Sequence, residues 1–219
     1  MFEYMKDEAL QFTSTPIKRK DTFGIVIHHF ASEASIKAIH AYDKTLGWIG
    51  IGYNVCVMLN GDVVLGRGLD TVGAHAGRKD TASKDYTTAI HNNDQTIGIG
   101  FQGYYHPGNA LSRKDMPIAQ YNAGFHLIQD LRKLYPTITF IKGHGEMPAT
   151  STVCPGSYFP LAAMVRDGWS TPDVIAPDGC FYAVQTGAFK SKNNALAEAK
   201  KIGGYIILKD ITHKTYTDL

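Results

Sequence analysis

The 219-residue sequence predicts an α/β fold, in which a mixed central β-sheet is flanked by helices and followed by a small β-α-β C-terminal segment. Short apolar runs rich in β-branched residues, typical of buried strands, occur at residues 23–30, 96–101 and 138–144. Stretches with apolar residues at three- and four-residue steps, the helical period, lie between these runs. Strands interspersed with helices favour a sheet with helices packed on its faces.

The first predicted strand, residues 23–30, carries two histidines at its C-terminal end. A helix should follow it, because Ser32 or Ser35 provides an N-cap and apolar residues then recur near helical spacing. These apolar residues are Ile36, Ala38, Ile39 and Tyr42. Residues 52–59 and 62–67 should then pair as a hairpin, since Asn60-Gly61 readily adopts the positive φ angles of a tight turn.

A buried strand at residues 96–101 begins the second half of the predicted domain. Pro117 pre-sets the first turn of a long helix that should end near Pro136. Its apolar residues at helical spacing are Ile118, Tyr121, Phe125, Ile128 and Leu131. The run at 138–144 then repeats the first pattern, a buried strand that delivers a histidine where it leaves the sheet.

The chain divides into one domain, a linker and a short tail. Residues 1–165 are long enough for one well-packed domain. Residues 166–179 combine Pro, Gly and Asp without helical or strand periodicity, which is typical of a linker. Residues 180–219 show a strand, helix and strand pattern, so we expect a separate segment there.

Composition excludes several classes of protein. The net charge of +2 does not indicate nucleic-acid binding, which normally requires a strongly basic surface. Three cysteines at irregular spacing argue against a disulfide framework. Residues 1–20 lack the apolar core of a secretory signal, so we expect no signal peptide. No apolar stretch approaches the roughly 20 residues that span a bilayer, so we expect no membrane insertion.

Two imidazoles and one thiolate form the candidate metal centre. Successive strand side chains point to opposite faces, so only one of His28 and His29 should bind the ion, and alternation does not say which. His144 and Cys154 lie at or beyond the end of the strand at 138–144. Structural zinc sites almost always take four protein ligands, whereas a catalytic ion keeps a position for water. This ligand set therefore indicates metal-assisted hydrolysis.

Five motifs occur in an order that carries a family resemblance: IVIHHF, GWIGIGYNVCVMLNGDVVLGRG, VGAHAG, TIGIGF and GHGEMPATSTVCPG. Residues 20–165 resemble the zinc-dependent N-acetylmuramoyl-L-alanine amidases of the peptidoglycan-recognition-protein and phage-lysozyme type. The resemblance implies that family's fold, a Zn²⁺ cofactor and the ligands His28, His144 and Cys154. It also implies that bacterial peptidoglycan is the partner.

The same resemblance suggests catalytic residues. Tyr53 matches the family's active-site tyrosine, and its hydroxyl is assigned to the oxyanion or the attacking water; a tyrosine packed on the core is the alternative. Thr152 stands at a position where some phage relatives carry a catalytic lysine. Animal amidases of the family carry a threonine there. The loop is two residues longer than the commonest family pattern, so Glu146 or Lys142 is a further candidate for proton transfer.

Two more residues are candidates for substrate binding. His75 resembles a substrate-groove histidine that contacts the muramoyl sugar or donates to the oxyanion; a hydrogen-bonded loop histidine is the alternative. Arg67 is expected to pair with a peptide carboxylate or to make a structural hydrogen bond. The other histidines are expected to be hydrogen-bonded or solvated, and Cys56 to be a small core residue.

The tail resembles the first half of a sporulation-related (SPOR) repeat, a module that binds glycan strands stripped of stem peptides. A segment of this size has little surface to bury, so we expect it to pair with a second copy of the chain, giving a homodimer, or to pack on the catalytic domain.

Together these features predict a zinc amidase that cleaves the bond between N-acetylmuramic acid and L-alanine. A wall-directed tail without a leader fits a phage or prophage endolysin that stays in the host cytoplasm until a holin opens the membrane. The alternatives are a cytosolic muropeptide-recycling amidase and a non-catalytic peptidoglycan receptor, whose members typically lack the cysteine ligand.

Overall fold

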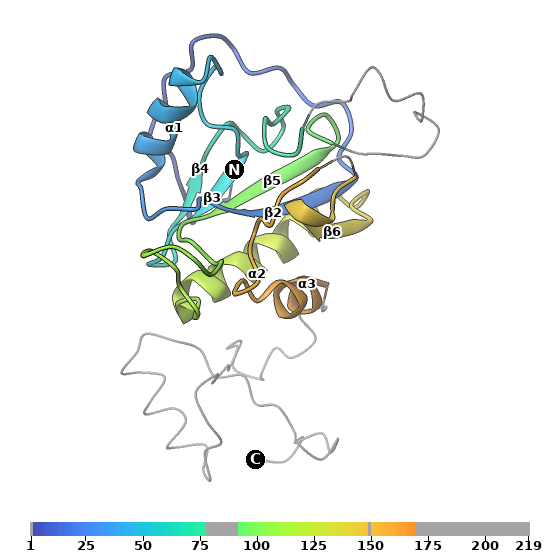
Figure 1. Ribbon diagram of the computed structural model, residues 1–219. Coiled ribbons are helices and arrows are strands. Elements are labelled where there is room, and N and C mark those ends of the chain that lie inside the picture. The colour runs from blue at the N-terminus through green and yellow to red at the C-terminus, as the bar shows by residue number, and fades with distance from the viewer. Residues whose placement is uncertain (1, 78–91, 149, 170–219) are drawn as a thin grey trace. The chain divides into compact units, whose positions relative to one another are not determined.

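The computed structural model describes residues 2–77, 92–148 and 150–169 (Figure 1). Contacts divide the chain into two units, Met1–Trp169 and Ser170–Leu219, and the account below concerns the first. The predicted SPOR-like segment at 180–219 lies outside the described residues, and so does most of the predicted linker. Within the described part of the chain, no helix is both long and apolar enough to cross a membrane.

One six-stranded sheet forms the centre of the first unit, in the order β1-β4-β3-β5-β2-β6. β2 lies between β5 and β6 and runs parallel to both, and β3 runs parallel to β5. β4 is antiparallel to β3, and β1 pairs parallel with β4. The strands are β1 Met5–Lys6, β2 Gly24–His29, β3 Val55–Val57, β4 Val63–Leu65, β5 Thr96–Phe101 and β6 Phe140–Gly143.

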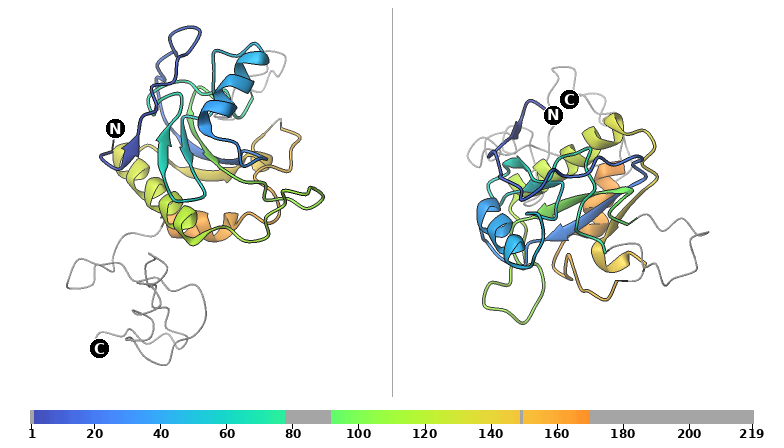
Figure 2. Two further views of the ribbon diagram at one scale, coloured as in Figure 1. Left: turned by 90° about the vertical axis from the view of Figure 1, so that its left-hand side faces the viewer. Right: turned by 90° about the horizontal axis from the view of Figure 1, so that it is seen from above.

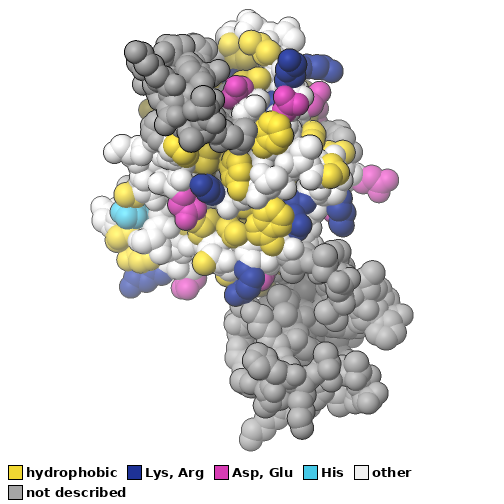
Figure 3. Space-filling view, turned by 90° about the vertical axis from the view of Figure 1, so that its right-hand side faces the viewer, with side chains coloured by type: hydrophobic (Ala, Val, Ile, Leu, Met, Phe, Trp, Pro, Cys, Tyr) yellow, Lys and Arg dark blue, Asp and Glu magenta, His cyan; other side chains and the backbone are white. Residues whose placement is uncertain are grey.

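Helices cover both faces of this sheet, as Figures 1 and 2 show, with α1 (Ile36–Thr45) on one face and α2 (Ile118–Leu134) and α3 (Leu161–Trp169) on the other. A short 3₁₀ turn, His144–Glu146, follows β6. The predicted mixed sheet flanked by helices is therefore confirmed. On the face drawn in Figure 3, hydrophobic side chains lie among both basic and acidic ones.

The two faces of the sheet are packed by alternate strand residues. Ile25 and Ile27 of β2 belong to the largest hydrophobic cluster, which includes residues of α2 and α3 such as Leu131 and Met164. Phe30 and Cys56 belong to the cluster on the α1 face, so the expected core role of Cys56 is confirmed.

Local signals in the sequence located several boundaries. Ser35 caps α1, and its hydroxyl accepts a hydrogen bond from the amide of Ala38 at 3.3 Å. Gly61 has φ of 89° in the predicted turn between β3 and β4. Pro117 immediately precedes α2, which ends at Leu134 as expected.

Two local predictions need correction. Tyr42 was expected on the apolar face of α1 but is 60% exposed; the buried residues of this helix are Ile36, His40 and Asp43. The linker does not begin at residue 166, because residues 166–169 complete α3. The Arg132 guanidinium of α2 lies 4.0 Å from the centre of the Trp169 ring and donates to the carbonyl of Gly168, which holds this last turn on the domain.

Candidate metal centre

The candidate centre lies where parallel strands end. His28 is the second-last residue of β2, and His144 directly follows β6, which pairs with β2. In open α/β sheets, side chains that leave the carboxyl ends of neighbouring parallel strands meet at one edge, where ligands bind. Cys154 reaches the same edge from the loop after β6 and is partly buried.

His28, His144 and Cys154 offer ligand atoms that all lie within 4.8 Å of one another. Nδ1 of His28 is 3.7 Å from Sγ of Cys154, and the centres of the His28 and His144 rings are 4.5 Å apart. Two imidazole nitrogens and one sulfur match the ligand types and number of an open, catalytic metal site. The three residues selected from the sequence are therefore brought together, and they fit one cation.

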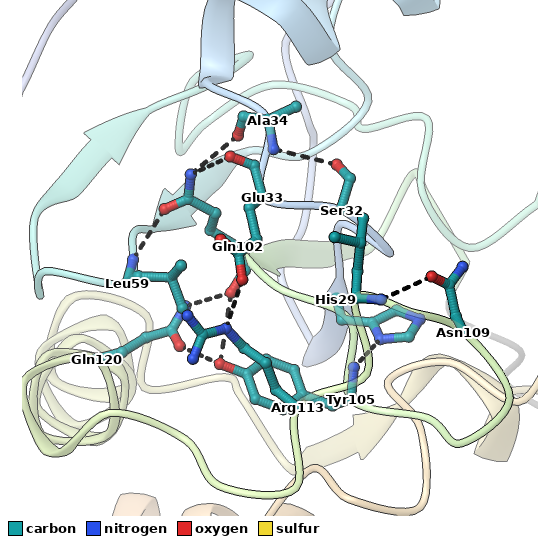
Figure 4. Close-up of polar contacts among 11 residues, drawn as sticks. His29, Ser32, Glu33, Ala34, Leu59, Gln102, Tyr105, Asn109, Arg113 and Gln120 are labelled. Atoms are coloured by element: carbon teal, nitrogen blue, oxygen red, sulfur yellow. Dashed lines mark hydrogen bonds and ion pairs between the residues drawn. The ribbon is translucent and has the colours of Figure 1, made fainter.

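The structure also decides between the two adjacent histidines. Nδ1 of His29 accepts a hydrogen bond from the Tyr105 amide at 3.0 Å (Figure 4). The His29 ring also stacks on Tyr104, so it is not one of the three clustered ligands. Its backbone nevertheless contributes to the centre. The His29 amide donates to Sγ of Cys154 at 3.4 Å, and its carbonyl accepts from the Tyr53 hydroxyl at 3.3 Å.

Burial controls the protonation of these groups. Burial, followed by the proximity of His75 and His144, lowers the pKa of His28 well below its usual value, so this imidazole is neutral near neutral pH. Burial also lowers the pKa of His144. Burial raises the pKa of the Cys154 thiol to about 12, while the hydrogen bond from the His29 amide acts in the opposite direction. Neutral imidazoles can bind a cation directly, whereas this thiol needs one to stabilise its thiolate.

Tyr53 borders the cluster from the α1 face. Its ring lies 5.2 Å from the His28 ring and stacks on Phe30. Gly100 of β5 makes room for it, because a Cβ at this position would lie 2.6 Å from Cδ2 of Tyr53. Burial, followed by the proximity of Cys154, raises the pKa of Tyr53 well above its usual value. The hydroxyl therefore stays protonated and can donate a hydrogen bond beside the metal ligands.

His75 is buried beside the metal-ligand candidate His28. Its side chain is only 6% exposed, and Nδ1 lies 2.9 Å from Nε2 of His28. The His75 amide donates to Oδ1 of Asn93 at 2.7 Å. A Cβ at Gly98 of β5 would lie 2.4 Å from Cγ of His75, so this glycine lets the ring pack against the strand. The position matches the alternative of a hydrogen-bonded loop histidine.

A family model described as N-acetylmuramoyl-L-alanine amidase matches residues 18–157, more than half of the chain. The chain belongs to this family. Among curated proteins, it is 31% identical over 142 residues to peptidoglycan-recognition protein SC2 of Drosophila simulans, covering 60% of this chain and 67% of that protein. It is 27% identical over 168 residues to the endolysin of Enterobacteria phage K11, covering 73% and 93%.

Solved structures show the same amidase-family fold. The chain is similar to N-acetylmuramoyl-L-alanine amidase LysC from Clostridium intestinale, with a TM-score of 0.58 and 23% identity, covering 73% of this chain and 93% of that one. It is also similar to Drosophila PGRP-LB, with a TM-score of 0.56 and 20% identity over 73% and 91% of the two chains.

In this amidase-family domain, Arg67 makes structural hydrogen bonds. Its Nε donates to the carbonyl of Ile51 at 2.9 Å, and Nη2 donates to that of Gly50 at 3.0 Å. These bonds hold the segment that precedes Tyr53. They correspond to the structural alternative predicted for Arg67, and its pairing with a peptide carboxylate stays a prediction.

Thr152 and the two candidates for proton transfer, Glu146 and Lys142, lie on or near the loop after β6. Oε2 of Glu146 accepts from the Gly143 amide at 2.7 Å, and Oγ1 of Thr152 accepts from the Cys154 amide at 3.2 Å. Both side chains belong to exposed residues. The Lys142 ammonium lies 5.8 Å from the centre of the Phe140 ring, on the same strand. Their catalytic roles stay predictions.

Two buried asparagines that support the amidase-family site were not selected from the sequence. Asn54, next to Tyr53, donates to the carbonyls of Gly68 and Thr71 and accepts from the Gly98 amide at 2.9 Å. Asn93 accepts from the amides of both His75 and Ala76. Asn54 follows Tyr53 directly and precedes an apolar strand, a polar position that could have been flagged; no comparable signal marks Asn93.

Proposed function

We propose that this chain is a zinc-dependent N-acetylmuramoyl-L-alanine amidase that hydrolyses the amide between N-acetylmuramic acid and L-alanine in peptidoglycan. The convergence of His28, His144 and Cys154 within 4.8 Å carries the proposal, in a chain that belongs to the amidase family. Further support comes from the K11 endolysin and from LysC, whose names describe a lytic enzyme and an amidase.

His28, His144 and Cys154 would hold the ion, and a site with only three protein ligands would stay open to solvent or substrate. Bound zinc supplies Lewis-acid activation of water and of the scissile carbonyl. The protein prepares for this chemistry by keeping His28 neutral and by directing the His29 amide at the Cys154 sulfur. Both features favour a bound cation over an empty, protonated site.

Tyr53 is the proposed electrophilic group. Hydrolysis places negative charge on the former carbonyl oxygen, and a fixed donor beside that oxygen stabilises the transition state more than the ground state. The Tyr53 hydroxyl is protonated, and its ring is fixed between Phe30 and His28. It exchanges its bond to the His29 carbonyl for one to the developing oxyanion or the attacking water.

Glu146 is proposed as the proton-transfer group, with Thr152 as a polar neighbour of the reacting atoms. Glu146 lies two residues after His144, and its carboxylate is oriented by the Gly143 amide. Thr152 cannot take up a proton, but it is two residues before Cys154 and bonds the amide of that ligand.

The product spectrum tests the proposed reaction. Purified peptidoglycan is digested with the full chain, and the products are identified by mass spectrometry. Intact glycan chains and stem peptides with a free L-alanine amino terminus are expected, whereas cleavage between sugars would contradict the proposal. Binding of peptidoglycan without any release of amino groups would instead identify a non-catalytic receptor, the second function compatible with the peptidoglycan-recognition relatives.

Lysis of the host wall is the proposed biological setting. An endolysin should reduce the turbidity of intact wall suspensions, whereas a muropeptide-recycling amidase should act only on soluble anhydro-muropeptides. We further propose, from the sequence alone, that residues 180–219 bind peptide-free glycan strands. Retention of the full chain on amidase-digested glycan, but not of a chain ending at Trp169, is the expected result.

A further inference from the structure

His75, Thr96 and His28 form a hydrogen-bonded row behind the candidate metal centre. Nε2 of His75 lies 3.4 Å from Oγ1 of Thr96, and Nδ1 of His75 lies 2.9 Å from Nε2 of His28. Nδ1 of His28 then faces Sγ of Cys154 at 3.7 Å. All three residues of the row are buried, with exposures of 6%, 0% and 1%.

The available protons give this row a direction. Oγ1 of Thr96 donates its single proton to the Asn92 carbonyl at 2.8 Å, so it can only accept from His75. His75 therefore carries its proton on Nε2, which leaves Nδ1 as an acceptor. The proton between the two rings then belongs to Nε2 of His28, and Nδ1 of His28 keeps its lone pair on the side of Cys154.

The opposite arrangement is unfavourable. If His75 carried its proton on Nδ1, its buried Nε2 would face a hydroxyl that has no proton to give. A neutral His28 would then be protonated on Nδ1, the atom that faces Cys154. An unpaired buried acceptor and a blocked ligand atom would result.

We propose that His75 is a positioning residue that fixes the tautomer and orientation of His28, so that His28 binds the metal ion through Nδ1, and that Thr96 fixes His75 in turn. This inference rests on the proposed zinc site. It gives the buried histidine of the GAHAG motif a role behind a metal ligand instead of in the substrate groove. Outer-shell partners of this kind orient a metal ligand and increase its basicity.

Variants at both positions separate an orienting role from simple packing. His75→Leu removes the acceptor, whereas His75→Asn keeps an oxygen near the position of Nδ1. Thr96→Val removes the hydroxyl at nearly constant volume, and Thr96→Ser keeps it. His40→Asn is the matched control. His40 is also buried and makes two hydrogen bonds, to the Gln11 carbonyl and the Ile51 amide. Neither of these partners is a proposed metal ligand.

The first readout is the zinc dissociation constant of the full chain, measured by competition with a chelating dye. His75→Leu should raise it about 10- to 100-fold, the range typical of lost outer-shell partners. Thr96→Val should raise it by a smaller factor. His75→Asn should restore part of the affinity, and Thr96→Ser and His40→Asn should match the wild-type chain. If folded His75→Leu binds zinc as tightly as the wild type does, this inference is overturned. The proposed zinc site itself would then still stand.

The second readout needs neither a variant nor bound zinc. Long-range ¹H–¹⁵N spectra of the zinc-free wild-type chain report which imidazole nitrogen of His28 carries the proton. The proton is expected on Nε2 of both His28 and His75. A proton on Nδ1 of His28 would overturn the proposed row, whereas a wild-type chain with the expected tautomers that fails to bind zinc would contradict the proposed function.

Discussion

The backbone amide of His29 lies 3.4 Å from Sγ of Cys154, although 125 positions separate the two residues in the chain. The carbonyl of the same residue accepts from the Tyr53 hydroxyl. The last residue of β2 thus positions a proposed metal ligand and a proposed catalytic donor through its backbone alone. β2 pairs with β5 as far as His29, which faces Phe101, whereas its pairing with β6 ends at Ile27, so the His29 amide is free to face Cys154 on that side.

Replacing the sulfur ligand tests the metal centre. Cys154→Ser substitutes a hydroxyl that does not ionise as readily as a thiol, so zinc binding should fail and amide hydrolysis should fall more than about 100-fold, beyond the usual effect of an outer-shell change. Cys56→Ala is the matched control, since Cys56 is also a free cysteine but is buried in the core. Comparable activity in Cys154→Ser and wild type would exclude Cys154 as a ligand.

Removing the Tyr53 hydroxyl should affect turnover more than metal binding. If the hydroxyl stabilises the oxyanion, Tyr53→Phe should lower kcat about 10²- to 10³-fold, with little change in zinc affinity. Tyr121→Phe provides the comparison, because it loses a bond to Asp167 outside the centre and should reduce thermal stability without reducing kcat. If the kcat of Tyr53→Phe is within a few-fold of the wild-type value, Tyr53 has only a packing role.

Two glycines of β5 should have separable effects. A Cβ at Gly98 would lie 2.4 Å from His75, and one at Gly100 would lie 2.6 Å from Tyr53 and 2.7 Å from Phe30. Each Gly→Ala change should destabilise the domain by about 1–3 kcal/mol through overpacking. Gly98→Ala should also weaken zinc binding, and Gly100→Ala should mainly reduce kcat. Isothermal titration and initial rates would show whether the two variants differ in this way.

Asp43 should produce a defined pH dependence of stability. Burial raises the pKa of this carboxyl, opposed by the Gly52 amide and by Arg67. The pKa of Asp43 is therefore higher in the folded chain than in the unfolded chain, where it is about 3.9. The contribution of this carboxyl to the free energy of unfolding is fully present below the unfolded pKa and is lost as pH rises through the folded pKa. The free energy of unfolding of Asp43→Asn should therefore increase relative to that of the wild type as pH rises through the folded pKa of Asp43.

Urea unfolding of both chains across this pH range would measure the difference in unfolding free energy. Asn keeps an acceptor for the Gly52 amide, so the comparison isolates the charge. A difference that is independent of pH, or that changes with the opposite sign, would refute the assignment.

The sequence predicted the parts of the fold that depend on local chemistry. The Ser35 cap, the turn at Gly61 and the buried strand at 96–101 follow from side-chain hydrogen bonding, glycine conformation and apolar runs. The buried face of α1 was missed because it carries His40 and Asp43, which are buried only because distant backbone groups bond to them. Tyr42 filled that place in an apolar pattern but is exposed.

For the site, ligand types and motif order selected His28, His144 and Cys154. Strand alternation alone could not decide whether His28 or His29 faces the other two ligands. The Tyr105 amide, far away in sequence, decides that His29 faces the opposite side. The burial of His75 could not be predicted from the sequence either, because it depends on the absence of a side chain at Gly98. Tertiary contacts of this kind leave no local pattern.

Removal and return of the metal ion tests the central claim most directly. The full chain is stripped with a chelator, and amino groups released from purified peptidoglycan are measured before stripping, after stripping and after addition of stoichiometric zinc. We predict that release stops in the stripped protein and returns with zinc, and that it does not return in Cys154→Ser. Full release by protein shown to be free of metal would contradict the account.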